Sequence, residues 1–446
     1  MTVLKQTHQH SHQRPHDRGP TGHALPPMTV AEAFEAVVDG PLPLRFTAYD
    51  GSTAGPADAA VSLHLRTPRG AAYIATAPGD LGLARAYVSG DLDIEGAHPG
   101  DPYPVLAAMG SIRFQVPGPR TLAAIARALG SGVLHPPPPP PQEALPRWRR
   151  VAEGLRHSKT RDAEAIHHHY DVSNAFYEKV LGPSMTYTCA CYPHEAATLE
   201  EAQENKYRLV FDKLRLKEGD RLLDIGCGWG GMVRYAARRG VRAIGATLSR
   251  EQAAWAQRAI EEEGLADLAE VRFSDYRDVP ETGFDAVSSI GLTEHIGVKQ
   301  YPSYFRSIKA RLRDGGLLLN HCITRPDNRR TSTGAFIDRY VFPDGELTGS
   351  GTIIAAMQDV GLEVRHEENL REHYALTLAG WCRNLVDSWD QCVEEVGEAT
   401  ARVWGLYMAG SRYGFETNVV QLHQVLAVKL DGRGDAHLPL RPWWGG

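Results

Sequence analysis

Apolar runs alternate with helical periodicity through the middle of the chain. The apolar runs are short and carry few charges, which is typical of buried strands. Strands are expected over residues 221–224, 241–248, 270–274, 284–291 and 316–323. Helices are expected between them, over residues 232–239, 249–264 and 300–313. This alternation predicts an α/β fold with a doubly wound, mainly parallel sheet.

Shorter apolar runs, broken by Gly, Pro and Asp, come before this region. Helical spacing covers residues 29–38, and the stretch 84–96 resembles a helix end followed by a turn. Short strands are expected over residues 42–49, 60–66 and 71–76. The mixture predicts a smaller α+β domain over residues 29–132, which would act as a scaffold or present a substrate.

Composition sets the remaining boundaries. Residues 1–28 are rich in His, Gln, Pro and Gly, which predicts a disordered tail in preference to a metal site. The unbroken run Pro136–Pro141 predicts a stiff linker over residues 133–146. A second domain would then occupy residues 147–435, followed by a C-terminal tail over 436–446.

The overall balance of the 446 residues is that of an ordinary globular protein, with 42% hydrophobic and 23% charged residues. A net charge of −6 gives no bulk basic character, so nucleic acid is not an expected partner. The six cysteines are scattered and no secretory leader is recognised, which predicts reduced thiols and a cytoplasmic protein. No apolar run reaches the roughly 18 residues of a membrane-spanning helix.

One local stretch differs from this balance. Residues 147–161 hold six basic side chains and one acidic side chain around Trp148. Such a segment suits an anionic membrane surface. A solvated linker helix explains it equally well.

The most informative stretch is Arg221–Gly231, where an apolar strand ends at Asp224 and a glycine-rich turn precedes a helix. This arrangement is typical of nucleotide sites. A dinucleotide site would need an acidic residue at the tip of the next strand, where Ser249 and Arg250 follow instead. The pattern therefore favours S-adenosylmethionine (SAM).

Other polar and aromatic residues lie where chemistry is expected. Glu294 follows the fourth strand and His321 lies late in the fifth, near the edge where such sheets bind ligands. The adjacent histidines 167–169 point in different directions on a helix, so no metal site is predicted. Residues 334–351 resemble a loop, and residues 374–413 a helical, aromatic insert. The insert suggests an apolar substrate, although each aromatic alone also fits a core.

The chain resembles the cyclopropane-fatty-acyl-phospholipid synthases, a family that includes the mycolic acid cyclopropane synthases. The resemblance covers residues 147–430 and depends on several motifs in family order. They are His169–Asn174, Met185–Ala190, Leu223–Gly231, Ser274–Asp278, Thr293–Gly297, Leu319–Ile323 and Tyr374–Leu378. The N-terminal region, with Tyr87–Asp93, is similar to the smaller domain of the two-domain bacterial synthases. The mycolic acid enzymes lack that domain, so a phospholipid substrate is expected.

The resemblance implies a Rossmann-like class I SAM-dependent methyltransferase domain that adds a methyl group to an acyl double bond. A carbocation would follow, and a bound bicarbonate would act as the base that closes a cyclopropane ring. The expected cradle of the bicarbonate is Cys189, Glu294, His321, the Ile323 backbone and Tyr374. The expected SAM contacts are Tyr187, Thr188, Asp224, Gly226, Gly228, Gly230, Thr247, Leu248 and Gln252, with Tyr276 and Arg277 flanking the adenine.

The sequence leaves more than one function open. Thr293 stands where an aromatic residue or Met is common in the family, so the product is either a cyclopropane or a 10-methylene chain. A reductase partner would convert the methylene into a methyl branch, as in actinobacterial 10-methyl fatty acid pathways. A non-catalytic lipid-binding protein and a small-molecule methyltransferase are two further hypotheses. The resemblance also implies a homodimer that binds the inner face of the cell membrane peripherally.

Overall fold

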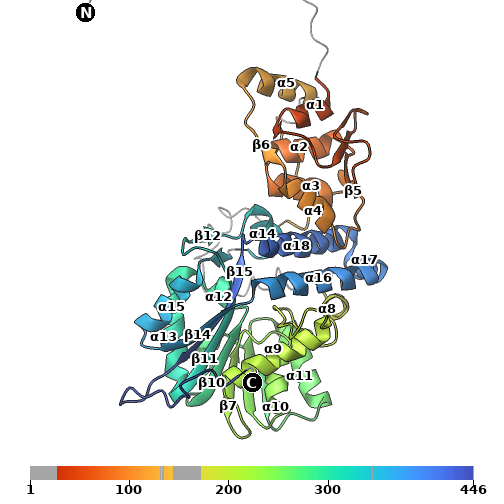
Figure 1. Cartoon of the computed structure of the whole chain (residues 1–446). Helices are drawn as coiled ribbons and strands as arrows, with labels where there is room; N and C mark the ends of the chain where they lie inside the picture. The colour runs from red at the N-terminus through yellow and green to blue at the C-terminus, as the bar shows by residue number, and fades with distance from the viewer. Residues whose placement is uncertain (1–27, 131, 133–134, 144–171, 344, 445–446) are drawn as a thin grey trace, which may run out of the picture.

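The computed structural model describes residues 28–130, 132, 135–143, 172–343 and 345–444. Figure 1 shows an α/β part with a central sheet and a smaller N-terminal part at one end. The predicted tail, the basic stretch 147–161 and the histidines 167–169 lie outside the described residues. No helix among the described residues is long and apolar enough to cross a membrane.

Among the described residues, the central sheet has seven strands in the order β14-β15-β11-β10-β7-β8-β9. The bounds are β7 Arg221–Ile225, β8 Arg242–Thr247, β9 Ala269–Phe273, β10 Phe284–Ile290, β11 Leu312–Thr324, β14 Glu363–Asn369 and β15 Gln421–Val428. Strands β7 to β11 are parallel, and β15 runs antiparallel between β11 and β14. The predicted mainly parallel, doubly wound sheet is therefore confirmed.

Helices cover both faces of this sheet. One face holds α9 Leu199–Lys213, α10 Gly231–Ala237 and α11 Arg250–Glu262, and the other holds α13 Tyr301–Arg311 and α15 Ser350–Asp359. Neighbouring residues of one strand face opposite layers: Leu222 packs in the first core and Leu223 in the second. Such near-continuous apolar strands are expected where helices bury both faces of a sheet.

A helical insert lies beyond the carboxyl ends of the parallel strands (Figure 1). Its elements are α8 Asn174–Leu181, α12 Thr293–Ile296, β12 Thr331–Ser332, α14 Ala335–Tyr340, β13 Glu346–Leu347, α16 Arg371–Asp387, α17 Trp389–Val396 and α18 Glu398–Glu416. Two 3₁₀ turns, η2 Tyr276–Asp278 and η3 Val298–Gln300, adjoin the sheet. The loop expected over 334–351 contains α14, because the Asp80 carboxylate accepts from the Phe336 N–H at the start of this helix.

The N-terminal part contains a sheet in the order β3-β2-β4-β5 and a separate β1-β6 pair. Its strands are β1 Val38–Asp39, β2 Arg45–Ala48, β3 Thr53–Ala54, β4 Ser62–Leu65, β5 Leu92–Glu95 and β6 Arg113–Phe114. Its helices are α1 Val30–Glu35, α2 Pro68–Thr76, α3 Asp80–Val88, α4 Tyr103–Gly110 and α5 Pro119–Leu129. The strand predicted over 71–76 is wrong. This segment belongs to α2, because Thr67 caps the Gly70 N–H at 3.1 Å, Pro68 opens the helix and alanines favour it.

The two parts pack directly against each other. Helix α18 contacts α3 and α4, and Arg402 of α18 donates to the Tyr87 carbonyl at 3.2 Å. The side chain of Glu143, just after the proline run, is 0% exposed and pairs with Arg85 of α3 and Arg339 of α14. The segment after Pro136–Pro141 therefore joins the two parts instead of only spacing them.

Candidate active site

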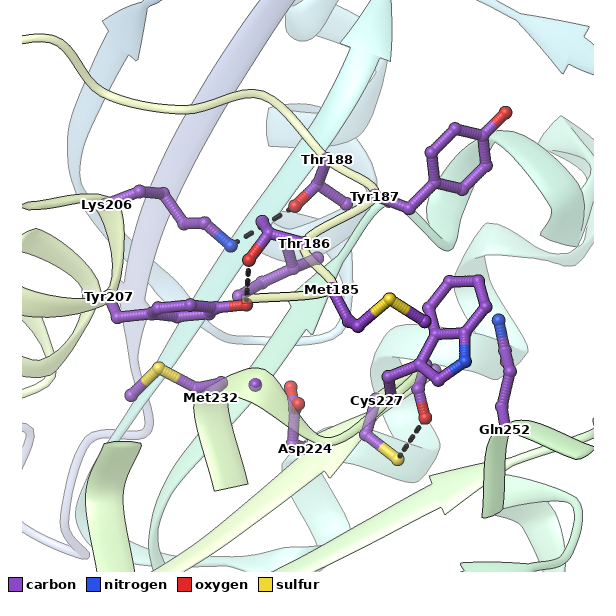
Figure 2. A pocket seen from close by; sticks show the side chains of 16 residues that line it. Met185, Thr186, Tyr187, Thr188, Lys206, Tyr207, Asp224, Cys227, Met232 and Gln252 are labelled. Carbon is purple, nitrogen blue, oxygen red and sulfur yellow. Dashed lines mark hydrogen bonds between the residues drawn. The ribbon is translucent and has the colours of Figure 1, made fainter. Parts of the chain in front are cut away.

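A cavity lies at the carboxyl end of β7, beside the glycine turn (Figure 2). Gly226 and Gly228 line it, and both have positive φ, +73° and +54°. A Cβ atom at Gly228 would meet no atom within 4 Å, so a side chain there would extend into open space. The turn therefore leaves room for a ligand against the backbone, as the sequence predicted.

Two buried charged groups face this cavity. Asp224 accepts a 2.6 Å hydrogen bond from the Ser288 hydroxyl, and its burial raises its pKa to about 6. Lys206 of α9 is 1% exposed, and its ammonium donates to Thr188 Oγ1 at 3.2 Å. A carboxylate and an ammonium at one cavity are suited to the ammonium and carboxylate of an amino acid. The methionine portion of SAM carries both groups, so these residues fit that cofactor.

The predicted SAM contacts divide into two groups. Tyr187, Thr188, Asp224, Gly226, Gly228 and Gln252 line the cavity. The lining does not include Gly230, Thr247, Leu248, Tyr276 or Arg277. Thr247 contacts the cavity lining through Gln252, because its hydroxyl donates to Gln252 Oε1 at 3.0 Å. Tyr276 packs edge-on against Tyr304, and Arg277 pairs with Asp275.

A second cavity, of about 120 Å³, adjoins the first. The two share Tyr187, Thr188 and Gly291 in their walls. The rest of the second wall is largely apolar and includes Ile337, Phe342, Leu347, Leu378, Phe415 and Val420. A polar cavity beside an apolar cavity can bring a charged donor to a hydrocarbon acceptor.

Glu294, in the short helix α12, lies in the wall of the apolar cavity with Ile323 and Tyr374. Its Oε1 accepts from the Ile323 N–H at 3.4 Å. Its Oε2 is buried and has no hydrogen-bond partner among the described residues. Burial raises the pKa of Glu294 to about 7. The carboxyl group can therefore gain or lose a proton near neutral pH.

His321 is fully buried on β11, opposite Gln424 of β15. Gln424 Oε1 accepts from the Lys213 ammonium at 2.7 Å, so the amide nitrogen faces His321 and donates to Nδ1 at 3.1 Å. Burial holds the pKa of His321 well below its ordinary value, so the ring is neutral. The proton must then reside on Nε2, which has no partner in the described part of the chain.

Cys189 and His321 do not line the apolar cavity, whereas Glu294, Ile323 and Tyr374 do. Cys189 is fully buried, and its Sγ donates to the Ala190 carbonyl at 3.1 Å. Burial raises the pKa of this thiol well above its ordinary value, so it is neutral. The Tyr374 ring packs on Phe415 at 4.6 Å. Three of the five predicted catalytic residues thus share one wall.

Sequence reasoning missed several polar residues of the site. Lys206 and Tyr207 line the first cavity, and Lys213 and Gln424 orient His321. The pattern of helix α9 could have shown that Lys206 and Lys213 share its apolar face, since they are separated by seven residues. Gln424 carries no comparable local signal, because its role depends on its pairing with β11.

The family model for mycolic acid cyclopropane synthetases matches residues 157–425. A probable fatty acid methyltransferase of Mycobacterium tuberculosis is 69% identical over 420 residues, covering 94% of this chain and 98% of the relative. The cyclopropane-fatty-acyl-phospholipid synthase of Escherichia coli is 34% identical over 261 residues, covering 58% of this chain and 66% of the relative.

Solved structures give the same picture for the larger part of the molecule. A cyclopropane synthase from Mycobacterium tuberculosis superimposes with a TM-score of 0.57 at 30% identity, over 61% of this chain and 99% of its own. A mycolic acid cyclopropane synthase complexed with SAH and CTAB has a TM-score of 0.56 at 29% identity, over 60% of this chain and 98% of its own.

Proposed function

Because this chain belongs to the mycolic acid cyclopropane synthetase family of SAM-dependent methyltransferases, we propose that it methylates the double bond of an unsaturated phospholipid acyl chain and closes a cyclopropane ring. The contact between the two cavities supports this proposal most directly. Tyr187, Thr188 and Gly291 belong to both walls, so a donor in the polar cavity meets a hydrocarbon in the apolar one.

In the polar cavity, the residues suit the donor. SAM supplies an electrophilic methyl group on a sulfonium. Asp224 would accept from its ammonium, and Lys206 would bind its carboxylate. Gly226 and Gly228 allow the ligand to approach the backbone closely.

In the apolar cavity, the largely hydrocarbon lining would keep water away from a carbocation on the acyl chain. Glu294 Oε2 and the His321 Nε2–H are buried hydrogen-bonding atoms without a partner among the described residues. Of these two residues, Glu294 lines the apolar cavity and His321 lies outside its lining, so a small hydrogen-bonding base such as bicarbonate would bind at Glu294 Oε2. Glu294, with its pKa near 7, would hold or release the proton. In this proposal Tyr374 completes the wall, and Cys189 supports it from outside the lining.

A 10-methylene product is the second candidate. The relative at 69% identity is named a fatty acid methyltransferase, without mention of a cyclopropane ring. Thr293, where an aromatic residue or Met is common in the family, is the sequence feature behind this candidate. It is fully buried, donates to Asn320 Oδ1 at 2.5 Å and does not line the apolar cavity itself, so its effect on the acyl pocket would be indirect. A methyl-branched product would then require a separate reductase.

Product analysis tests the proposal. The purified protein is incubated with SAM and oleoyl phospholipid vesicles, and the acyl chains are examined by mass spectrometry and proton NMR. We expect chains heavier by one CH₂ group with the upfield ring protons of a cyclopropane. Olefinic CH₂ protons would instead identify the methylene product. Unchanged oleoyl chains would contradict both candidates.

A further inference from the structure

A large apolar chamber lies between the N-terminal part and helix α18. Its volume is about 650 Å³, within the range of roughly 300–1,000 Å³ that is typical of ligand pockets. The N-terminal part supplies one wall, including Leu83, Tyr87 and Leu106, and α18 supplies the facing wall, including Leu406 and Gly410. The chamber therefore exists only because the two parts are docked.

The chamber adjoins the apolar cavity of the candidate active site. The two spaces share Thr333, Ile337, Tyr407, Ser411 and Val420 in their walls. The apolar cavity in turn adjoins the glycine turn through Tyr187 and Thr188. Three adjoining cavities thus lie between the domain interface and the glycine turn, where the proposed function places the methyl donor.

The charged groups in the chamber wall are already engaged. Arg325 donates to the carbonyls of Val419 and Ser332, each at 2.9 Å. The Asp80 carboxylate accepts from the Phe336 N–H at 3.1 Å. The remaining wall is mostly hydrocarbon, so the chamber is suited to an apolar occupant.

We propose that this chamber holds the hydrocarbon of the lipid substrate remote from the reacting double bond, so that the N-terminal part forms a wall of the lipid site. The inference rests on the proposed function, since it assigns the occupant from the reaction at Glu294. Phe114 lines the chamber and is 60% exposed, so we expect the acyl chain to enter beside it. The chamber length would then restrict which acyl chains place a double bond at the donor.

Gly410 of α18 offers a precise test of this occupancy. A Cβ atom there would lie 3.9 Å from Leu106 Cδ1, an ordinary contact, so Gly410→Ala is a matched control that keeps the helix. Gly410→Phe would fill the chamber without touching the glycine turn or Glu294. Leu106→Trp fills it from the opposite wall and replaces Gly410→Phe if that variant does not fold.

The first readout is binding of a fluorescent saturated fatty acid, which has no double bond and cannot react. We expect Gly410→Phe to weaken this binding roughly tenfold or more and Gly410→Ala to leave it unchanged. The SAM affinity of both variants should equal that of the wild type. Equal probe binding in a folded Gly410→Phe variant would overturn the proposal.

The second readout is methylation of oleoyl vesicles, which separates the two proposals. If the wild type methylates the lipid and Gly410→Phe does so equally well, the chamber proposal is wrong and the proposed function stands. If the wild type does not methylate the lipid, the proposed function is wrong, and probe binding still decides whether the chamber takes hydrocarbon.

Discussion

Two buried carboxyl groups lie at the two cavities of the candidate site. Asp224 lies at the polar cavity with Lys206 nearby, and its pKa rises to about 6. Glu294 lies at the apolar cavity, where burial raises its pKa to about 7. Both were predicted from their positions after strands of the sheet. Their burial could not be predicted, because it results from packing between segments distant in sequence, such as Ser288 against Asp224 and Ile323 against Glu294.

We expect Glu294→Gln to lose roughly 10²- to 10⁴-fold in turnover while it still binds SAM, because the amide keeps the shape but cannot exchange a proton. Removal of bicarbonate should slow the wild type, and its addition should restore the rate. Turnover assays with calorimetry of SAM binding measure both effects, with the exposed Glu262→Gln as control. Full activity of Glu294→Gln, with or without bicarbonate, would mean that this carboxyl group only anchors its loop.

The same substitution should change stability with pH. The folded state binds more protons than the unfolded state between about pH 4.5 and 7, so Glu294 makes the free energy of unfolding fall as pH rises. The raised pKa corresponds to a cost of at most about 3 kcal/mol above pH 7. Urea unfolding should therefore show Glu294→Gln to be more stable than the wild type at pH 8, with little difference near pH 5. An equal difference at both pH values would contradict the raised pKa.

Five of the seven strands of the central sheet could be predicted from the sequence. The parallel strands β7 to β11 were predicted because their apolar runs lie between two helix layers. Strands β14 and β15 were not predicted. Strand β14 has the sequence Glu363-Val-Arg-His-Glu-Glu-Asn369, which looks like exposed chain, and β15 contains the buried polar residues His423 and Gln424. Both polar residues of β15 are satisfied by neighbouring strands and helices, which no local pattern reveals.

Gln424 allows the orientation of His321 to be tested. Gln424→Glu keeps the size and the contact with Lys213, but a carboxylate must accept from Nδ1, so the His321 proton moves from Nε2. We expect turnover to fall and its response to bicarbonate to weaken, with unchanged SAM affinity. Nitrogen NMR of the His321 ring reports the tautomer, and Gln421→Glu on the same strand is the control. An unchanged tautomer with reduced turnover would show that Gln424 acts only structurally.

The whole molecule is acidic, with a net charge of −6, yet one edge of the N-terminal part is basic and apolar. Val116 is 91% exposed and Leu122 is 47% exposed, and Arg113, Arg120 and Arg127 are exposed beside them. No residue of the described helix α5 is buried. An amphipathic, basic surface of this kind suits an anionic membrane. The predicted basic stretch 147–161 lies outside the described residues.

We expect the double variant Val116→Ser, Leu122→Ser to bind anionic vesicles about tenfold more weakly, because two apolar side chains no longer enter the lipid. Binding of the wild type should weaken as salt rises. Co-sedimentation measures both, with Leu440→Ser as control, since Leu440 is 99% exposed on the other part of the molecule. Unchanged binding of the double variant would exclude this edge as the membrane contact.

The transfer of a methyl group from SAM to an acyl double bond is tested most directly by following the methyl carbon. The wild type is given SAM labelled in its methyl group, with vesicles of either oleoyl or stearoyl phospholipid that are otherwise identical. We expect the label to enter the acyl chains of the oleoyl vesicles and to be absent from the saturated stearoyl chains. Label in both kinds of chain, or in neither, would contradict methylation of the double bond.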